Sequence, residues 1–327
     1  MAFQYWRQCA QPEPDRTLFL ALGGSYHGDT LGSVSVGGVS RFHAMFDPLL
    51  FDVVRGPCPD SYRTPDGIAD GQLAEYYLSK YEQLFEQFGS RMAAVVLEPI
   101  AQGACGMIVH PPGFLSGMKT LAERYGVLLI ADEIAVGMGR TGRMWACEWE
   151  DVVPDFLCSG KGLSGGYLPV AATVTSRRIW DAFLGEYSES KSFFHGHTYG
   201  GNPLGCAAAL ATLSVFDQED TLEHVGEQAD VLSELLAPVR GDRHVGDVRQ
   251  VGLLAAVELV ANTTTKEAYP WAEKRGYRAC EAAMRKGVLL RPLGNNIVIV
   301  PPLCSTADHL RQIVDAVRYG IKVAVVD

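Results

Sequence analysis

The sequence contains no run of lysine or arginine. Its 28 basic residues are outnumbered by 38 acidic ones, which gives a formal net charge of −10 at pH 7. Proteins that bind nucleic acids gather positive charge in a patch or stripe, because contacts with the phosphate backbone dominate their affinity. The composition therefore argues against a nucleic acid as a partner.

A long hydrophobic segment is also missing. The most apolar window, residues 92–109, is interrupted by Glu98, Pro99, Gln102 and glycines, whereas a membrane-spanning helix needs about 20 mainly apolar residues. The first sixteen residues lack the apolar core of a secretory signal peptide. We therefore expect no association with a membrane.

The eight cysteines form no CxxC pair. Neither a zinc site nor a small disulfide-bonded scaffold is indicated by their wide spacing. We expect them to be reduced and mostly buried, as in a cytoplasmic protein. They are Cys9, Cys58, Cys105, Cys147, Cys158, Cys206, Cys280 and Cys304.

Hydrophobic residues make up 47% of the chain and charged residues 20%, as in ordinary globular proteins. Apolar segments with strand character alternate with segments of helical periodicity, which predicts βαβ units and a mostly parallel sheet. The clearest unit has strands at 93–100 and 127–134 around a helix at 113–126. Two further strands are predicted at 154–161 and 168–176.

The following helix is predicted from Asn202 as N-cap and Pro203 at its first position, both preferred there. The pattern then changes, and we place a domain boundary near Phe216, between a large domain (1–216) and a small C-terminal α+β domain (217–327). The terminal helix is predicted to start at Ser305. In between we expect helices at 221–236 and 269–287, a strand at 251–260, and two strands within 288–303 around a Gly-Asn-Asn turn.

Two residues that follow predicted strands could carry chemistry. Ligands of parallel α/β sheets bind beyond the carboxyl ends of the strands, where Asp132 and Lys161 are expected. Asp132 could instead cap the next turn, and Lys161 could be a surface lysine. A P-loop is excluded, because Asp155 and Gly162 stand where that motif requires glycine and serine or threonine. A lysine on a loop of small residues can condense with an aldehyde.

Several longer motifs resemble the class III pyridoxal-phosphate aminotransferases, and the resemblance covers nearly the whole chain. It implies a fold of type I among pyridoxal-phosphate (PLP) enzymes. ADEI, GRTG and SGK are common to the class, whereas SYHGDT with HGHTYGGNPLGCAAA and RPLGN resembles the branch in biotin biosynthesis. The matching segments are SYHGDT (25–30), EPIAQGACGM (98–107), LLIADEIAVGMGRTG (128–142), PDFLCSGKGLSGG (154–166), HGHTYGGNPLGCAAA (195–209) and LLRPLGNNIVIVPP (289–302).

The resemblance implies PLP as the cofactor. Lys161 would form the Schiff base with its aldehyde and move a proton between the substrate and the cofactor. Asp132 would pair with the ring nitrogen, because a nearby negative charge favours the protonated ring. Tyr26 would lie on one face of the ring and Ile134 on the other.

The resemblance also implies a homodimer with a shared site. Thr198 would bind the cofactor phosphate of the neighbouring subunit, and His197 in the same loop is also expected to bind the cofactor. His195 and His197 form an HxH pair, but without a third ligand nearby the pair predicts a loop rather than a metal site.

For the substrate, the resemblance implies that Arg291 binds the carboxylate of a keto acid through two parallel hydrogen bonds. A surface ion pair is the alternative for this arginine. Asp29 would meet an amino group of donor or acceptor, and Tyr26 and Gly196 would complete the substrate site. The implied reaction converts 8-amino-7-oxononanoate to 7,8-diaminononanoate with S-adenosylmethionine, or lysine in some relatives, as amino donor.

For four other motif residues, the sequence does not separate a structural role near the cofactor ring from a catalytic one. They are Gln102, Glu133, Arg140 and Thr141.

The resemblance further implies a preceding portion with a Gly-Ser turn at a helix N-terminus that binds the cofactor phosphate. The chain is thus interpreted as a fragment or as a shortened homologue. Two alternatives remain open: another ω-amino-acid or diamine aminotransferase, and a non-catalytic fragment that associates with a full-length partner.

Overall fold

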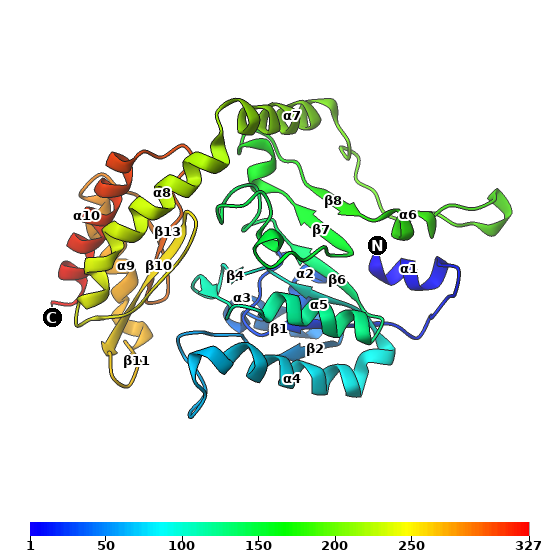
Figure 1. The fold of residues 1–327 in the computed structure, drawn as a ribbon, viewed down its shortest axis with the longest axis horizontal. Helices are drawn as coiled ribbons and strands as arrows, with labels where there is room; N and C mark the ends of the chain where they lie inside the picture. The colour runs from blue at the N-terminus through cyan, green and yellow to red at the C-terminus, as the bar shows by residue number, and fades with distance from the viewer. Residues whose placement is uncertain (327) are drawn as a thin grey trace.

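The computed structural model describes residues 1–326, which contain two separate main β-sheets (Figure 1). We call them the N-terminal sheet and the C-terminal sheet. A short hairpin of β4 (Ala101–Gln102) and β5 (Ile108–Val109) lies apart from both.

The N-terminal sheet has six strands and is mostly parallel, as predicted. Only the edge strand β8 runs antiparallel, next to β7. The predicted strands were located correctly, but the sequence interpretation did not include β1 and β2. The spatial order is β2 (Val53–Gly56), β1 (Leu18–Leu22), β3 (Met92–Leu97), β6 (Leu128–Asp132), β7 (Phe156–Ser159) and β8 (Ala172–Thr175).

Helices cover both faces of this sheet, which explains why its central strands are apolar throughout. On one face α4 (Leu73–Phe88) and α5 (Phe114–Arg124) enclose the largest core, with Tyr81, Phe85 and Phe114 fully buried. The other face is covered by three shorter helices. These are α1 (Ala2–Gln8), α2 (Leu31–Val36) and α6 (Arg177–Asp181); a further short helix, α3 (Ser40–His43), follows α2.

The C-terminal sheet is antiparallel and has five strands. Four of them follow the order β11-β10-β13-β12, and the fifth, β9, also pairs with β10. Three helices pack on one face and form its core. The predicted Gly-Asn-Asn turn is confirmed between β12 and β13. The elements are α8 (Thr221–Leu236), β9 (Val245–Val251), β10 (Leu254–Asn262), β11 (Glu267–Ala268), α9 (Arg275–Met284), β12 (Arg291–Leu293), β13 (Asn296–Ile299) and α10 (Ala307–Ala324).

Between the two sheets in sequence lies α7 (Pro203–Gln218), at the top of Figure 1. Its predicted start is confirmed, because the Asn202 side chain accepts a hydrogen bond from Gly205 N at 2.8 Å and Pro203 is the first helical residue. Although α7 is rich in small and apolar residues, it buries only Gly205 and Phe216. The helix thus presents an apolar surface to solvent.

Two local expectations are wrong. The terminal helix is capped by Thr306, whose side chain and that of His309 bond each other's backbone N–H, so Ser305 is not its N-cap. Only two cysteines, Cys147 and Cys280, are buried, although all eight are free thiols. Among the described residues, no helix combines the length and apolarity needed to cross a membrane.

Candidate active site

A cavity of about 860 Å³ opens beyond the carboxyl ends of the N-terminal sheet's central strands, with the β12–β13 hairpin as its other wall. This is the place at which parallel α/β sheets bind ligands. Residues that are far apart in sequence meet here. Of the predicted site residues, the cavity wall contains Tyr26, Asp29, Asp132, Ile134, Lys161 and Arg291.

Lys161 and Asp132 are brought to this cavity by neighbouring strands. Asp132 ends β6 and is the ladder partner of Cys158 on β7, three residues before Lys161. Lys161 lies just after β7 in the left-handed backbone region (φ 44°), which is uncommon for a residue with a side chain. Asp132 also accepts a hydrogen bond from Ile134 N at 3.1 Å. The same side chain therefore caps the turn that follows β6 and lines the cavity.

The second oxygen of Asp132 is held by a histidine that the sequence interpretation missed. His27 Nδ1 lies 2.7 Å from Asp132 Oδ2, and both side chains are nearly buried. Because a carboxylate only accepts hydrogen bonds, this contact assigns the proton to Nδ1. His27 Nε2 is buried without a partner among the described residues. The signal in the sequence was the YHG tripeptide, which placed His27 directly after Tyr26.

A buried carboxyl lies beneath Tyr26. Glu98 follows β3, and its two oxygens accept hydrogen bonds from Tyr26 N (3.0 Å) and Gly103 N (2.9 Å). Burial raises the pKa of Glu98 to about 7, against the smaller lowering effects of His27 and of these two bonds. Glu98 also lines the cavity. Glu98 begins the segment EPIAQGACGM (98–107) that carries part of the resemblance, but the sequence did not indicate it as a site residue.

The Tyr26 ring is surrounded by other aromatic rings. It lies parallel to His43 with ring centroids 6.0 Å apart and edge-on to Phe42 at 6.2 Å. Burial, followed by a hydrogen bond with Asp29, raises the pKa of Tyr26. The phenol therefore stays protonated at neutral pH, and its ring is held in one orientation at the cavity.

The motif residues Glu133 and Gln102 have structural partners away from the cavity. Glu133 accepts backbone hydrogen bonds from Ala146 and Cys147, both at 2.8 Å. Gln102 Nε2 donates to the Gly23 carbonyl at 2.9 Å. These contacts favour a structural role for both residues.

Arg140 connects the two sheets. Its guanidinium donates to the Leu253 carbonyl at 3.1 Å and to the Pro301 carbonyl at 2.6 Å, and both carbonyls belong to the C-terminal sheet region. Burial lowers the pKa of Arg140 to about 10. The neighbouring Thr141 is fully buried. The GRTG motif thus fastens the C-terminal sheet to the rest of the chain.

Three predicted residues lie outside the cavity wall: Gly196, His197 and Thr198, which are exposed on the loop before α7. The start of that loop is fixed to α1, because Gln4 and the Phe194 backbone exchange hydrogen bonds at 2.9 and 3.1 Å. In residues 1–326, no group of three His, Cys, Asp or Glu side chains is arranged to hold a metal ion.

A family model for class III aminotransferases matches residues 1–320. Two curated relatives are adenosylmethionine-8-amino-7-oxononanoate aminotransferases. That of Nitratidesulfovibrio vulgaris is 49% identical over 321 residues, and the alignment covers 98% of this chain and 59% of the relative. That of Geobacter sulfurreducens is 48% identical over 322 residues, and the alignment covers 98% of this chain and 71% of the relative. The chain thus spans about three fifths to seven tenths of their lengths.

Solved structures agree with these relatives. The adenosylmethionine-8-amino-7-oxononanoate aminotransferase of Methanocaldococcus jannaschii has a TM-score of 0.90 and 40% identity, with 99% of this chain and 72% of that chain covered. An ω-transaminase from Thermomicrobium roseum has a TM-score of 0.94 and 29% identity, with 99% and 71% covered. The expected PLP-enzyme fold is confirmed.

The cavity residues fit the family's cofactor. PLP needs an amine for its aldehyde, an acid for its ring nitrogen and flat or aliphatic surfaces for its two ring faces. Lys161, Asp132, Tyr26 and Ile134 offer these groups on one cavity wall. The orphaned Nε2 of His27, behind Asp132, is a further polar atom without a partner among the described residues.

Proposed function

The chain belongs to the class III aminotransferases, which depend on PLP, and we propose that it transfers an amino group to 8-amino-7-oxononanoate to give 7,8-diaminononanoate. The amino donor in this proposal is S-adenosylmethionine, as in the names of the relatives. The observation that carries the proposal is the meeting of Lys161, Asp132 and Arg291 at one cavity.

Lys161 is the proposed catalytic residue. When bound, PLP supplies an electron sink that stabilises negative charge on the carbon that loses its proton. The Lys161 amine would hold the cofactor through its aldehyde and, once free, would move a proton at the substrate carbon. The small residues around Lys161 leave room for this exchange.

Asp132, Tyr26 and Ile134 orient the cofactor in this proposal. The negative charge of Asp132 would hold a proton on the ring nitrogen, and the His27 N–H fixes the direction of that carboxylate. Tyr26 and Ile134 would cover the two faces of the ring and so would keep its plane in one orientation.

Arg291 is proposed to bind the carboxylate of the keto acid. It lines the cavity together with aliphatic side chains, among them Leu290, Leu293 and Val298. A substrate whose carboxylate is separated from the reacting carbon by an aliphatic chain matches this lining, since the chain buries apolar surface while the carboxylate meets the guanidinium. Asp29, with Tyr26, is proposed to contact the amino group.

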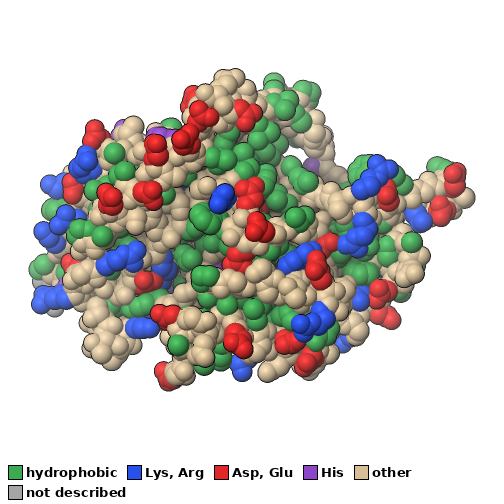
Figure 2. Space-filling view, viewed as in Figure 1, with side chains coloured by type: hydrophobic (Ala, Val, Ile, Leu, Met, Phe, Trp, Pro, Cys, Tyr) green, Lys and Arg blue, Asp and Glu red, His purple; other side chains and the backbone are tan. Residues whose placement is uncertain are grey.

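A second copy of the chain is proposed as a partner. The outer face of α7 exposes apolar side chains, with Leu204 72% and Leu210 67% exposed, and hydrophobic side chains gather around α7 on the face in Figure 2. Such a patch favours association. In the dimer, Gly196, His197 and Thr198 would contribute to the neighbour's site, with Thr198 on the cofactor phosphate.

The two sheets are proposed to form two domains, 1–216 and 217–327.

Free thiols at all eight cysteines agree with a reducing compartment, so we also propose a cytoplasmic location.

Addition of PLP to the purified chain tests the cofactor site. A visible absorbance band is expected, borohydride should fix the cofactor on Lys161 in a peptide digest, and Lys161→Ala should abolish both results. Lys80→Ala, a change of an exposed lysine on α4, is the matched control. No band at saturating PLP would contradict a catalytic role and favour a non-catalytic fragment.

Growth rescue tests the substrate. The gene should restore growth without biotin to a strain that lacks this amination step, and Lys161→Ala should not. The ω-transaminase neighbour favours a second candidate, transfer to another ω-amino acid or a diamine. Failure of rescue together with a normal absorbance band would support that candidate.

A further inference from the structure

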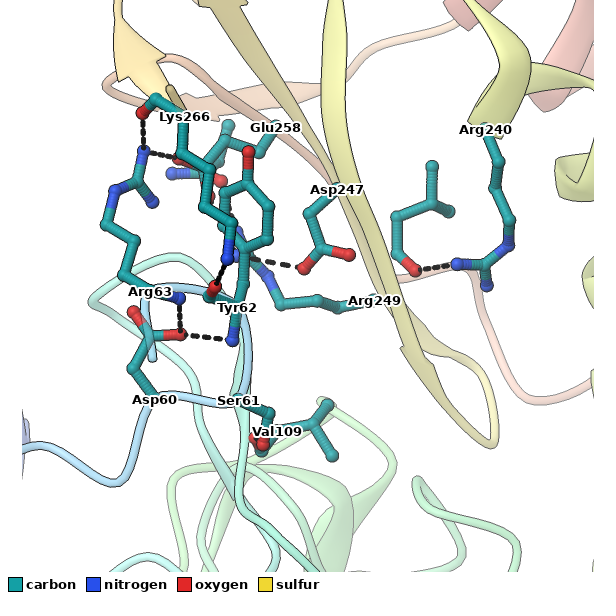
Figure 3. Close-up of polar contacts among 12 residues, drawn as sticks. Asp60, Ser61, Tyr62, Arg63, Val109, Arg240, Asp247, Arg249, Glu258 and Lys266 are labelled. Atoms are coloured by element: carbon teal, nitrogen blue, oxygen red, sulfur yellow. Dashed lines mark hydrogen bonds and ion pairs between the residues drawn. The ribbon is translucent and has the colours of Figure 1, made fainter. Parts of the chain in front are cut away.

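A buried ion-pair cluster lies on the face of the C-terminal sheet opposite its three helices (Figure 3). Its centre is Glu258 on β10, which is 4% exposed. The neighbours Val257 and Leu259 point into the helix-covered core, so the alternation of side chains along a strand directs Glu258 to the other face. A charge at such a position is costly unless it is paired.

Two arginines from different parts of the chain pair with this carboxylate. Arg249 on β9 contacts Glu258 Oε2 at 2.7 Å, and Arg63 from the loop before α4 contacts Oε1. Arg249 also contacts Asp247 at 3.3 Å. Removal of Arg63 should leave the Arg249–Glu258 pair in place, so Glu258 keeps one positive partner. Of the two arginine contacts to Glu258, the one from Arg63 crosses from the N-terminal part of the chain to the C-terminal sheet.

The segment around Arg63 is docked on the sheet by further contacts. The Tyr62 hydroxyl is buried next to Gly246 of β9, where a side chain would collide with it. Lys266, in the turn before β11, donates to the Tyr62 carbonyl, and Arg63 donates to the Lys266 carbonyl at 3.4 Å. In Figure 3 the Tyr62 and Arg63 side chains reach from their loop toward β9 and β10.

The cluster continues into the hairpin that carries Arg291. Glu258 is the ladder partner of Asn296 at the start of β13. Arg249 donates to Asn296 Oδ1, and Asn296 Nδ2 donates to the Leu293 carbonyl at 3.1 Å, across the hairpin turn. Arg291 stands on β12 opposite Val298, and both residues line the cavity.

The β10–β13 ladder is therefore held at both ends by an arginine from the N-terminal part. Arg140 binds the carbonyls of Leu253 and Pro301 at one end. Arg63 binds Glu258 at the other end, where the hairpin turns. Arg63 is thus the anchor at the end of the ladder that lies next to the hairpin turn.

We infer that Arg63 is a positioning residue, which through Glu258 holds the β12–β13 hairpin so that Arg291 faces the cavity across from Lys161. The inference rests on the proposed function of Arg291. Arg63 touches neither the cofactor nor the substrate in this assignment. Through the position of Arg291, Arg63 affects the affinity for a carboxylate, and it does not affect the cofactor site.

Hydrogen exchange tests the positioning without any cofactor. In Arg63→Ala, amides of residues 291–299 should exchange at least about tenfold faster, because the hairpin opens locally more often. Exchange in β3 should stay as in the parent chain. Unchanged exchange at 291–299, or an equal rise in β3, would overturn the inference. Arg124→Ala, which breaks the surface pair with Glu82, is the matched control.

Carboxylate binding is the second readout, with sodium nonanoate as the probe and calorimetry on the chain with and without PLP. Arg63→Ala should weaken nonanoate binding about 10-fold or more through misplacement of Arg291, and Arg63→Lys should restore part of the loss. The PLP absorbance band should not change.

Nonanoate binding by Arg63→Ala equal to that of the parent would overturn the inference. A parent chain without a PLP band would instead count against the proposed function, while the exchange experiment still decides the role of Arg63.

Discussion

His27 Nδ1 lies 2.7 Å from Asp132 Oδ2, although the two residues are 105 positions apart in sequence. The loop after β1 thus supports the acid at the end of β6. Together with the Ile134 N–H on the other oxygen, this contact leaves Asp132 one fixed orientation toward the cavity. Support of this kind is how folded proteins hold a reactive group within fractions of an ångström of its working position.

Replacement of the two partners should have different effects. Asp132→Asn should keep the PLP absorbance band but lose most turnover, because the ring nitrogen is no longer held protonated. His27→Ala should lower turnover about 10- to 100-fold, because without the His27 N–H the Asp132 carboxylate can move from its working position. Steady-state rates and PLP titrations of both variants give the comparison, and near-normal rates in Asp132→Asn would refute its role at the ring.

Arg291→Ala should raise the KM for the keto acid about 10- to 100-fold, since a hydrogen-bonded ion pair is lost. The KM of an amino donor bound elsewhere should change much less. Arg291→Lys should recover only part of the loss, because a lysine cannot form two parallel bonds with a carboxylate. Equal increases in both KM values would indicate general destabilisation instead.

Glu98 should make the protein less stable as the pH rises from about 4.5 to 7. Its pKa is raised to about 7 by burial, so the folded state binds more protons than the unfolded state in this window, and stability falls by up to about 3 kcal/mol. In Glu98→Gln this decline should disappear. Thermal unfolding at a series of pH values compares the slopes, and parallel slopes in the two proteins would contradict the expected titration.

His110 should have the opposite pH effect. Burial lowers its pKa to about 3, and both ring nitrogens are without partners among the described residues. The unfolded state therefore binds the extra proton below pH 6.5, and acidification from about 6.5 to 5 should cost about 2 kcal/mol. His110→Phe should remove this loss and keep the edge-on contact with Phe114. Chemical denaturation at pH 5 and 7 provides the measurement.

Elements with local determinants were predictable from sequence. The start of α7 follows from Asn202 and Pro203, and the β12–β13 turn follows from Gly294 and Asn295, because capping and turn preferences act over a few residues. The cap of α10 was placed one residue early. Serine and threonine are both preferred caps, and in the structure it is Thr306 that exchanges hydrogen bonds with His309.

Contacts across the fold were not predictable. The pairing of Asp132 with His27, the burial of Glu98 beneath Tyr26 and the Arg63–Glu258 contact each join segments about 70 or more residues apart, and no periodicity encodes them. Lys161 and Asp132 were found because both end strands, and the carboxyl ends of parallel strands share one edge.

If the proposed dimer forms through the solvent-facing leucines of α7, the stability of the protein depends on its concentration. A native state that hides such a surface by pairing gains free energy with each increase in total protein. The melting temperature of such a dimer rises on concentration and falls on dilution, so values measured at micromolar and nanomolar levels would describe different equilibria.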